Sequence, residues 1–166
     1  MGKGLVDLDI HQFAQHNERL TGYIRRGGEV GKLLKIQINT HQMLIGSSKH
    51  FLTLNPNIYS HGENSRAQYL WEQCYKYGVK IYLEDLWVQQ PARENDQFIM
   101  DEIVKKVNKA YVLKRLNNIR VYLKVSRLSD ITNAAGTGIR EDIFHGVPPT
   151  GPTASLLDWP KRRKPL

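Results

Sequence analysis

Residues 95–127 decide the fold class, and they read NDQFIMDEIVKKVNKAYVLKRLNNIRVYLKVSR. Their first half carries apolar residues at helical spacing, namely Ile99, Met100, Ile103, Val104 and Val107. Asn95 stands where a helix N-cap is expected, so the spacing predicts a helix that extends to about Lys109. Asp96 near its start and Lys106 near its end would complement the helix dipole.

The second half predicts another helix, from about Val112 to Arg127. Its main apolar stripe consists of Val112, Leu116, Ile119 and Leu123. Val121 and Val125 form a second strip, and a helix that is apolar on two sides packs between two neighbours. We therefore expect this helix to be central. The matched stripes predict that the core contains Ile99, Ile103, Val107, Leu116, Ile119 and Leu123.

The N-terminal region predicts one clear helix and one ambiguous segment. The clear helix begins at Ile10, after the capping residue Asp9, and the Gly27-Gly28 pair ends it. Residues 31–46 fit either a helix or strands, because their apolar residues satisfy both periods. As strands, they would contribute to a small hairpin within residues 34–54.

A further helix is predicted between a cap at Asn64 or Ser65 and a stop at Gly78. Cys74 falls on its apolar side. We therefore expect this thiol to be a buried hydrophobic group and not a nucleophile.

These elements predict a mainly α fold of four or five helices around a single core, with the hairpin as an added element. The helical domain would comprise residues 1–145. Residues 146–166 would form an extended tail, because five prolines and two glycines within them exclude a regular helix.

Positive charge is concentrated towards the C-terminus of this 166-residue chain, whose net charge is +8. Residues 103–129 contain eight basic residues and no acidic one. Such a field attracts polyanions, of which nucleic acid is the most common. The predicted phosphate contacts are Lys105, Lys109, Lys114, Arg115, Arg120, Lys124, Arg127, Lys161, Arg162, Arg163 and Lys164. Arg120, Lys124 and Arg127 follow one helix edge, where they could bind phosphates or cover apolar surface with their stems.

Catalytic and metal-binding motifs are incomplete. The six histidines are scattered, and no Cys or carboxylate stands at ligand spacing, so we expect no metal and no cofactor. The segment Tyr82-Leu83-Glu84-Asp85 departs from the Tyr-x-Asp-Asp turn of polymerases and is interpreted as two acids at an exposed turn. We expect a binding domain; an enzyme with an unrecognised carboxylate site stays the third alternative.

The sequence also predicts a cellular location. It contains no apolar run long enough to cross a membrane and no apolar signal core at its start. A single cysteine excludes an internal disulfide and fits a reducing compartment. We therefore expect an intracellular protein of the nucleus or cytoplasm, with no membrane partner.

Four short motifs follow one another in the C-terminal half of the chain. They are Arg93-Glu94-x-Asp96, Ile99-Met100-Asp101, Leu116-Asn117-x-x-Arg120-Val121-Tyr122-Leu123 and Leu128-Ser129-Asp130-Ile131-Thr132-Asn133-Ala134-Ala135-Gly136-Thr137. In this order they resemble a region of eukaryotic retroelement polyproteins that carry a reverse transcriptase, outside the polymerase catalytic core. The resemblance covers about residues 33–160, including Leu70-Trp71-Glu72 and Trp159-Pro160. It implies association with element nucleic acid and assigns no catalytic residue.

Charge and resemblance together predict non-catalytic binding of DNA or RNA. The alternative is a protein-interaction or assembly domain that packs on a larger polypeptide. A continuous positive surface would favour nucleic acid, whereas an exposed apolar patch would favour a protein partner.

Overall fold

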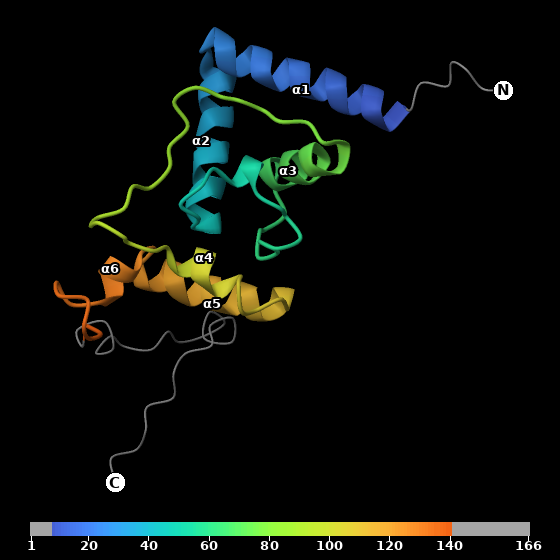
Figure 1. Ribbon diagram of the computed structural model, residues 1–166. Coiled ribbons are helices and arrows are strands. Elements are labelled where there is room, and N and C mark those ends of the chain that lie inside the picture. Colours follow the sequence, from blue (N-terminus) through green and yellow to red (C-terminus); the bar gives the residue numbers. More distant parts are fainter. Residues whose placement is uncertain (1–7, 141–166) are drawn as a thin grey trace, which may run out of the picture.

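The computed structural model describes residues 8–140, which are mainly helical (Figure 1). The predicted tail of residues 146–166 and its four basic residues lie outside the described range. The elements in chain order are α1 (Leu8–Arg26), α2 (Glu29–Ile45), the 3-10 turn η1 (Phe51–Thr53), α3 (Arg66–Tyr77), α4 (Ile99–Ile103), α5 (Ala110–Leu123) and α6 (Leu128–Ile131).

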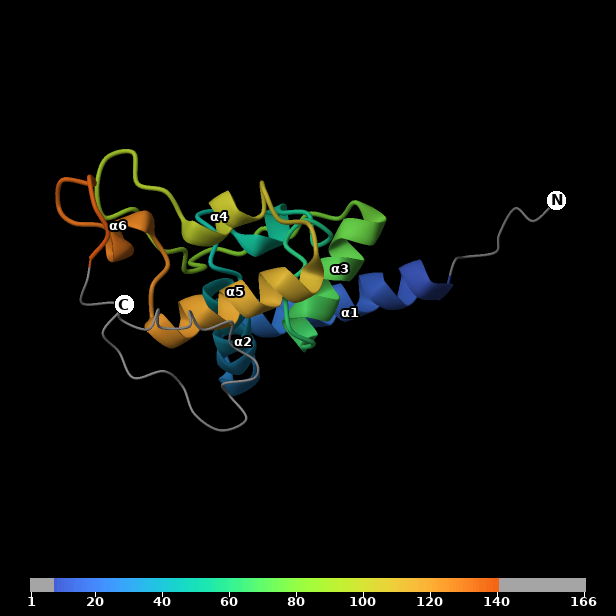
Figure 2. The same cartoon turned by 90° about the horizontal axis from the view of Figure 1, so that it is seen from below.

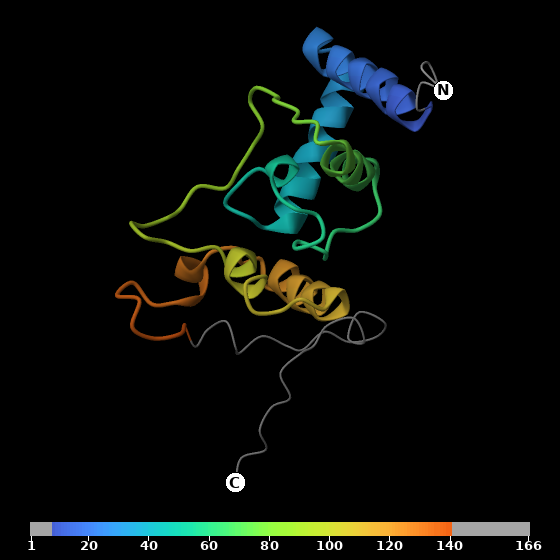
Figure 3. The same cartoon turned by 45° about the vertical axis from the view of Figure 1, so that its right-hand side comes forward.

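Helices α1 and α2 meet at a sharp corner (Figure 3). Gly27 has φ +68°, a conformation that glycine adopts without strain, so the predicted stop of α1 is confirmed. Gly31 lies so close to the carbonyl of Tyr23 that a β-carbon would collide with it. Phe13 and Leu20 are buried on one side of α1, whereas Ile10 near its start is exposed.

Residues 31–46 are helical, because they belong to α2 and its αL cap at Gly46. Ile38, His41 and Ile45 form the buried face of α2. The hairpin predicted within residues 34–54 is therefore wrong. Residues 8–140 contain no β-strand, only two isolated β-bridges.

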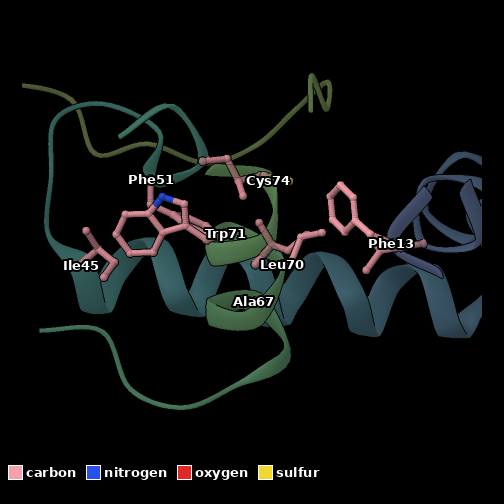
Figure 4. Packing of buried hydrophobic residues seen from close by; sticks show 10 residues of the cluster. Phe13, Ile45, Phe51, Ala67, Leu70, Trp71 and Cys74 are labelled. Atoms are coloured by element: carbon pink, nitrogen blue, oxygen red, sulfur yellow. The ribbon is translucent and has the colours of Figure 1, made fainter. Parts of the chain in front are cut away.

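The core lies where α3 and η1 pack against α2 (Figure 4). Ser65 accepts a hydrogen bond from the backbone N–H of Gln68 and Gly78 has φ +65°, so both predicted ends of α3 are confirmed. Trp71 is fully buried, and its Nε1 donates to the Leu54 carbonyl at 2.9 Å. Cys74 is buried as predicted, and burial raises the pKa of its thiol to about 11.

The helix predicted from Asn95 to Lys109 is wrong in extent, because α4 spans only Ile99–Ile103. Asn95 has φ +57° and does not cap a helix. Phe98 is extended and pairs with Arg127 in an isolated bridge. This local pairing replaces the first predicted helical turn, while residues 104–106 form a turn that leads to α5.

Helix α5 ends at Leu123, where Lys124 adopts φ +57°, and not at Arg127 as predicted. It lies at the end of α2 opposite α1 (Figure 1), and Figure 2 views the molecule from this end with α5 in front of α2. The prediction of a central helix is wrong, because Tyr111 and Val121 are exposed.

The buried face of α5 also differs from the predicted stripe. It consists of Leu113, Asn117 and Arg120. The six residues predicted for the core are half-buried, and none of them is exposed. They are Ile99, Ile103, Val107, Leu116, Ile119 and Leu123. The apolar stripe was displaced because the polar residues Asn117 and Arg120 turn towards α2, as described below.

Candidate nucleic-acid interface

The eight basic residues of segment 103–129 divide into two groups. Arg120 is buried and Arg127 is half-buried. The others are exposed, namely Lys105, Lys106, Lys109, Lys114, Arg115 and Lys124.

Arg120 joins the C-terminal end of α2 to α5. Arg120 is only 5% exposed, and its Nη2 donates to the carbonyls of Met43 at 3.0 Å and Leu44 at 2.9 Å. Nε donates to Asn117 Oδ1 at 3.0 Å, and Nη1 donates to the Val125 carbonyl at 3.3 Å. Burial lowers the pKa of Arg120 to about 10, so it stays charged at neutral pH. The last turn of α2 contains no basic residue of its own. The guanidinium of Arg120 lies at this end of the helix and complements the negative end of the helix dipole.

Gly46 makes this arrangement possible in two ways. Its φ of +72° caps α2 in the left-handed region. A β-carbon at this position would lie 2.7 Å from Cζ of Arg120, so a side chain would displace the guanidinium. Gly46 and Arg120 therefore form one structural unit.

Arg127 is also committed to contacts within the fold. Its Nη2 lies 2.9 Å from Oδ1 of Asp130, and its Nη1 donates to the Gln90 carbonyl at 3.1 Å. Partial burial of Asp130 opposes ionisation, but hydrogen bonds from Arg127 and Ser126 prevail and lower the pKa of this carboxyl. Arg120, Lys124 and Arg127 therefore do not form an exposed row. Of the three, only Lys124 is exposed, as a phosphate contact must be.

The remaining exposed cations precede α5 or lie in its first two turns. This α5 basic cluster consists of Lys105, Lys106, Lys109, Lys114 and Arg115. Lys105 contacts Glu102 at 2.8 Å, yet its side chain is 65% exposed. Tyr111 lies between the cations in sequence and is 59% exposed.

The position of the α5 basic cluster is unfavourable for the stability of helix α5 itself. Lys109 is the N-cap residue, and its ammonium group cannot accept a hydrogen bond from the first-turn N–H groups. The first turn contains no acidic residue. Cations at the positive end of a helix dipole are unfavourable by about 0.3–1 kcal/mol each. The sequence prediction had placed Lys106 and Lys109 at the favourable C-terminal end of a longer helix, and the early end of α4 reverses that relation.

The polar residues of the retroelement-like motifs meet between residues 92–97 and α6. Arg93 Nη2 donates to Thr132 Oγ1 at 3.0 Å, and Ser129 Oγ donates to Asp96 Oδ2 at 2.6 Å. Partial burial of Asp96 raises its pKa, but hydrogen bonds led by Ser129 outweigh this and lower it. These motif positions hold segments together that are distant in sequence, which is a structural role.

A buried polar network lies between α2 and α3. The rings of His41 and His61 are both inaccessible, and His41 Nε2 donates to Gln68 Oε1 at 2.9 Å. His61 Nε2 donates to the Ile45 carbonyl at 2.9 Å, and its Nδ1 is buried without a hydrogen-bond partner. Burial lowers the pKa of His61 to about 4. No local sequence pattern identifies His61 as a buried residue.

The two acids of the polymerase-like segment lie at a turn. Glu84 and Asp85 are exposed, and Asp85 has φ +59°, so the interpretation as an exposed turn is confirmed. Within residues 8–140, no three His, Cys, Asp or Glu side chains come close enough to hold a metal ion. Over the same residues, no helix is long and apolar enough to cross a membrane.

Comparison with known proteins gives no relative. No protein-family model matches the chain, and neither the curated proteins nor the solved structures contain a significant match. The function must therefore be argued from the residues themselves.

Proposed function

We propose that this protein binds nucleic acid without catalysis, through the α5 basic cluster. The observation that carries the proposal is the concentration of exposed cations at a helix N-terminus that has neither an acidic residue nor a side-chain cap. Among the contacts of residues 8–140, the cluster forms a single ion pair, between Lys105 and Glu102. A phosphate beside α5 would satisfy both the cations and the dipole.

Exposed Tyr111 extends the proposal towards single strands, because a base can stack on an aromatic ring between basic side chains. Duplex DNA would use only the phosphate contacts. The proposal therefore covers both DNA and RNA, and the comparison of strands is part of its test.

The proposed contact set is smaller than the one expected from sequence. Arg120 and Arg127 leave it, because their donors are used within the fold. Lys124 stays as an exposed cation at the other end of α5. The tail residues Lys161, Arg162, Arg163 and Lys164 stay as predicted contacts outside the described range. Retroelement origin and intracellular location also remain parts of the proposal.

The test is a binding titration with labelled single-stranded RNA and duplex DNA, between about 50 and 200 mM salt. If four phosphates are neutralised on the duplex, log affinity falls with log salt at a slope of about −3.6. Replacing Lys109, Lys114 and Arg115 with Gln should flatten the slope by roughly 2–3 units. Circular dichroism should show an unchanged fold, because these side chains are exposed.

A matched control separates a local interface from net charge. Replacing Arg19, Arg25 and Lys80 with Gln removes the same charge at exposed positions outside the α5 basic cluster. This control should keep the wild-type slope. Equal flattening in both triple variants would show that the overall charge, and not the α5 basic cluster, attracts nucleic acid.

The assembly alternative has an observation of its own. Helix α2 exposes a row of apolar side chains on the face opposite the core, and sequence analysis did not detect it. Exposed apolar patches of this kind mark interaction surfaces. This candidate function is compatible with nucleic-acid binding at the α5 basic cluster, because that cluster and the exposed face of α2 use different residues.

A further inference from the structure

The outer face of α2 carries exposed apolar side chains, with exposed Thr40 between Ile36 and Met43. Val30, Leu33, Ile36 and Met43 are between 52% and 60% exposed. They recur three, three and seven residues apart, which spreads them over an arc of about 140° of the helix circumference. The opposite side holds Ile38 and the core. The row is about 20 Å long, the length of one short partner helix.

At its lower end the row opens into a hollow of about 520 Å³ between α2, residues 87–89 and the end of α5. Its apolar walls include Met43, Leu44, Trp87 and Val121. The backbone N–H of Trp87 donates to Asn39 Oδ1 at 3.3 Å, so this wall is tied to α2. A bulky apolar side chain of an occupant would fit here as an anchor.

Cations outnumber acids around this face, where exposed Glu29 is the acidic residue of α2. Lys32 is exposed beside the upper part of the row, and Lys124 lines the hollow. After Glu29, α2 contains no acidic residue, and neither residues 86–92 nor α5 contain one. The surface therefore favours a partner whose apolar stripe is flanked by carboxylates.

We propose that the α2 face and the adjoining hollow bind an amphipathic helix of a protein partner, with an apolar stripe and acidic flanks. The row supplies the helix-sized apolar contact, the hollow takes one large anchor residue, and Lys32 and Lys124 select acidic flanks. This inference rests on the assembly alternative and not on nucleic-acid binding, and its test contains no nucleic acid.

The test uses the full chain as bait for a display library of helical peptides. Each peptide carries apolar residues at i, i+3, i+4 and i+7, and its flanking positions are randomised among Glu, Gln and Lys. We expect Glu to be enriched over Lys at the flanks of the selected peptides. Binding of a selected peptide should weaken about tenfold when Leu33 and Ile36 are both changed to Gln.

Two further variants make the result specific. Replacing Lys32 and Lys124 with Gln should weaken the selected acidic peptide about threefold, and should not weaken a version with Gln flanks. The control variant replaces Tyr69 and Tyr75, exposed on α3, with Gln and should bind as wild type does. Circular dichroism verifies that each variant is folded.

Three results would overturn the inference. One is a library without binders, and another is enrichment of Lys at the flanks. The third is a wild-type dimer at micromolar concentration that the Leu33 and Ile36 variant abolishes, since the occupant would then be a second copy of the chain. Loss of nucleic-acid binding in the α5 variants would leave this test unaffected.

Discussion

Arg120 should stabilise the fold and should not contact phosphate. The perturbation that separates these roles is Arg120→Met, which keeps an unbranched side chain but removes every donor. The prediction follows from the position of the guanidinium, which is buried against the last carbonyls of α2 and the chain after α5.

The magnitude can be worked out from its partners. Arg120→Met leaves the carbonyls of Met43, Leu44 and Val125 without the donors that now satisfy them. The Val125 contact is buried and the other two are partly buried, so each orphaned acceptor costs about 1 kcal/mol, which gives roughly 3 kcal/mol for the three. Relief of the buried charge opposes this loss, and the lost complement to the α2 dipole adds to it.

The assay is urea unfolding followed by circular dichroism, with Lys114→Gln as an exposed control on the same helix. Arg120→Met should lower the free energy of unfolding by about 3 kcal/mol, whereas the control should change it by less than about 0.5 kcal/mol. A small stability loss combined with a flatter salt dependence of nucleic-acid binding would refute this reasoning, because Arg120 would then act on phosphate.

Three other perturbations test the fold. Gly46→Ala should cost about 2 kcal/mol in wild type and less in the Arg120→Met background, because part of the cost is displacement of the guanidinium; unfolding of the double variant measures this coupling. Burial lowers the pKa of His61 from 6.5 to about 4. The free energy of unfolding should therefore decrease by about 3 kcal/mol as pH falls between these values, because the unfolded chain takes up the proton first. His61→Gln should reduce that pH dependence of unfolding, and the rest should come from His41 and His50, whose pKa values burial also lowers. Leu113→Ala should cost about 2–5 kcal/mol in urea unfolding, and half-buried Leu116→Ala about 1–2 kcal/mol.

Local signals predicted the helices well where caps and stops lie within a few residues. Helix α3 begins after Ser65 and ends before Gly78, and α1 ends at the glycines after Arg26. Hydrogen bonds to nearby backbone groups determine these ends. The helix predicted from Asn95 failed for the opposite reason. Its first turn pairs with residues that follow α5, and no local pattern contains that pairing.

The candidate site was predictable as a charged region but not residue by residue. A run of cations without acids identifies the region from sequence alone. The inward turn of Arg120 depends on carbonyls 76 and 77 residues earlier in the chain. The exposed row of α2 was hidden for a similar reason, since apolar residues cover both sides of that helix and only the fold decides which side is buried.

Protection of lysines from chemical acetylation tests the central claim most directly. Each lysine is acetylated with and without bound RNA, and the extent of modification is measured by mass spectrometry. The account predicts that RNA protects Lys106, Lys109 and Lys114, while Lys49 and Lys80 react as in the free protein. Protection of Lys49 and Lys80 to the same extent, or no protection at the start of α5, would contradict it.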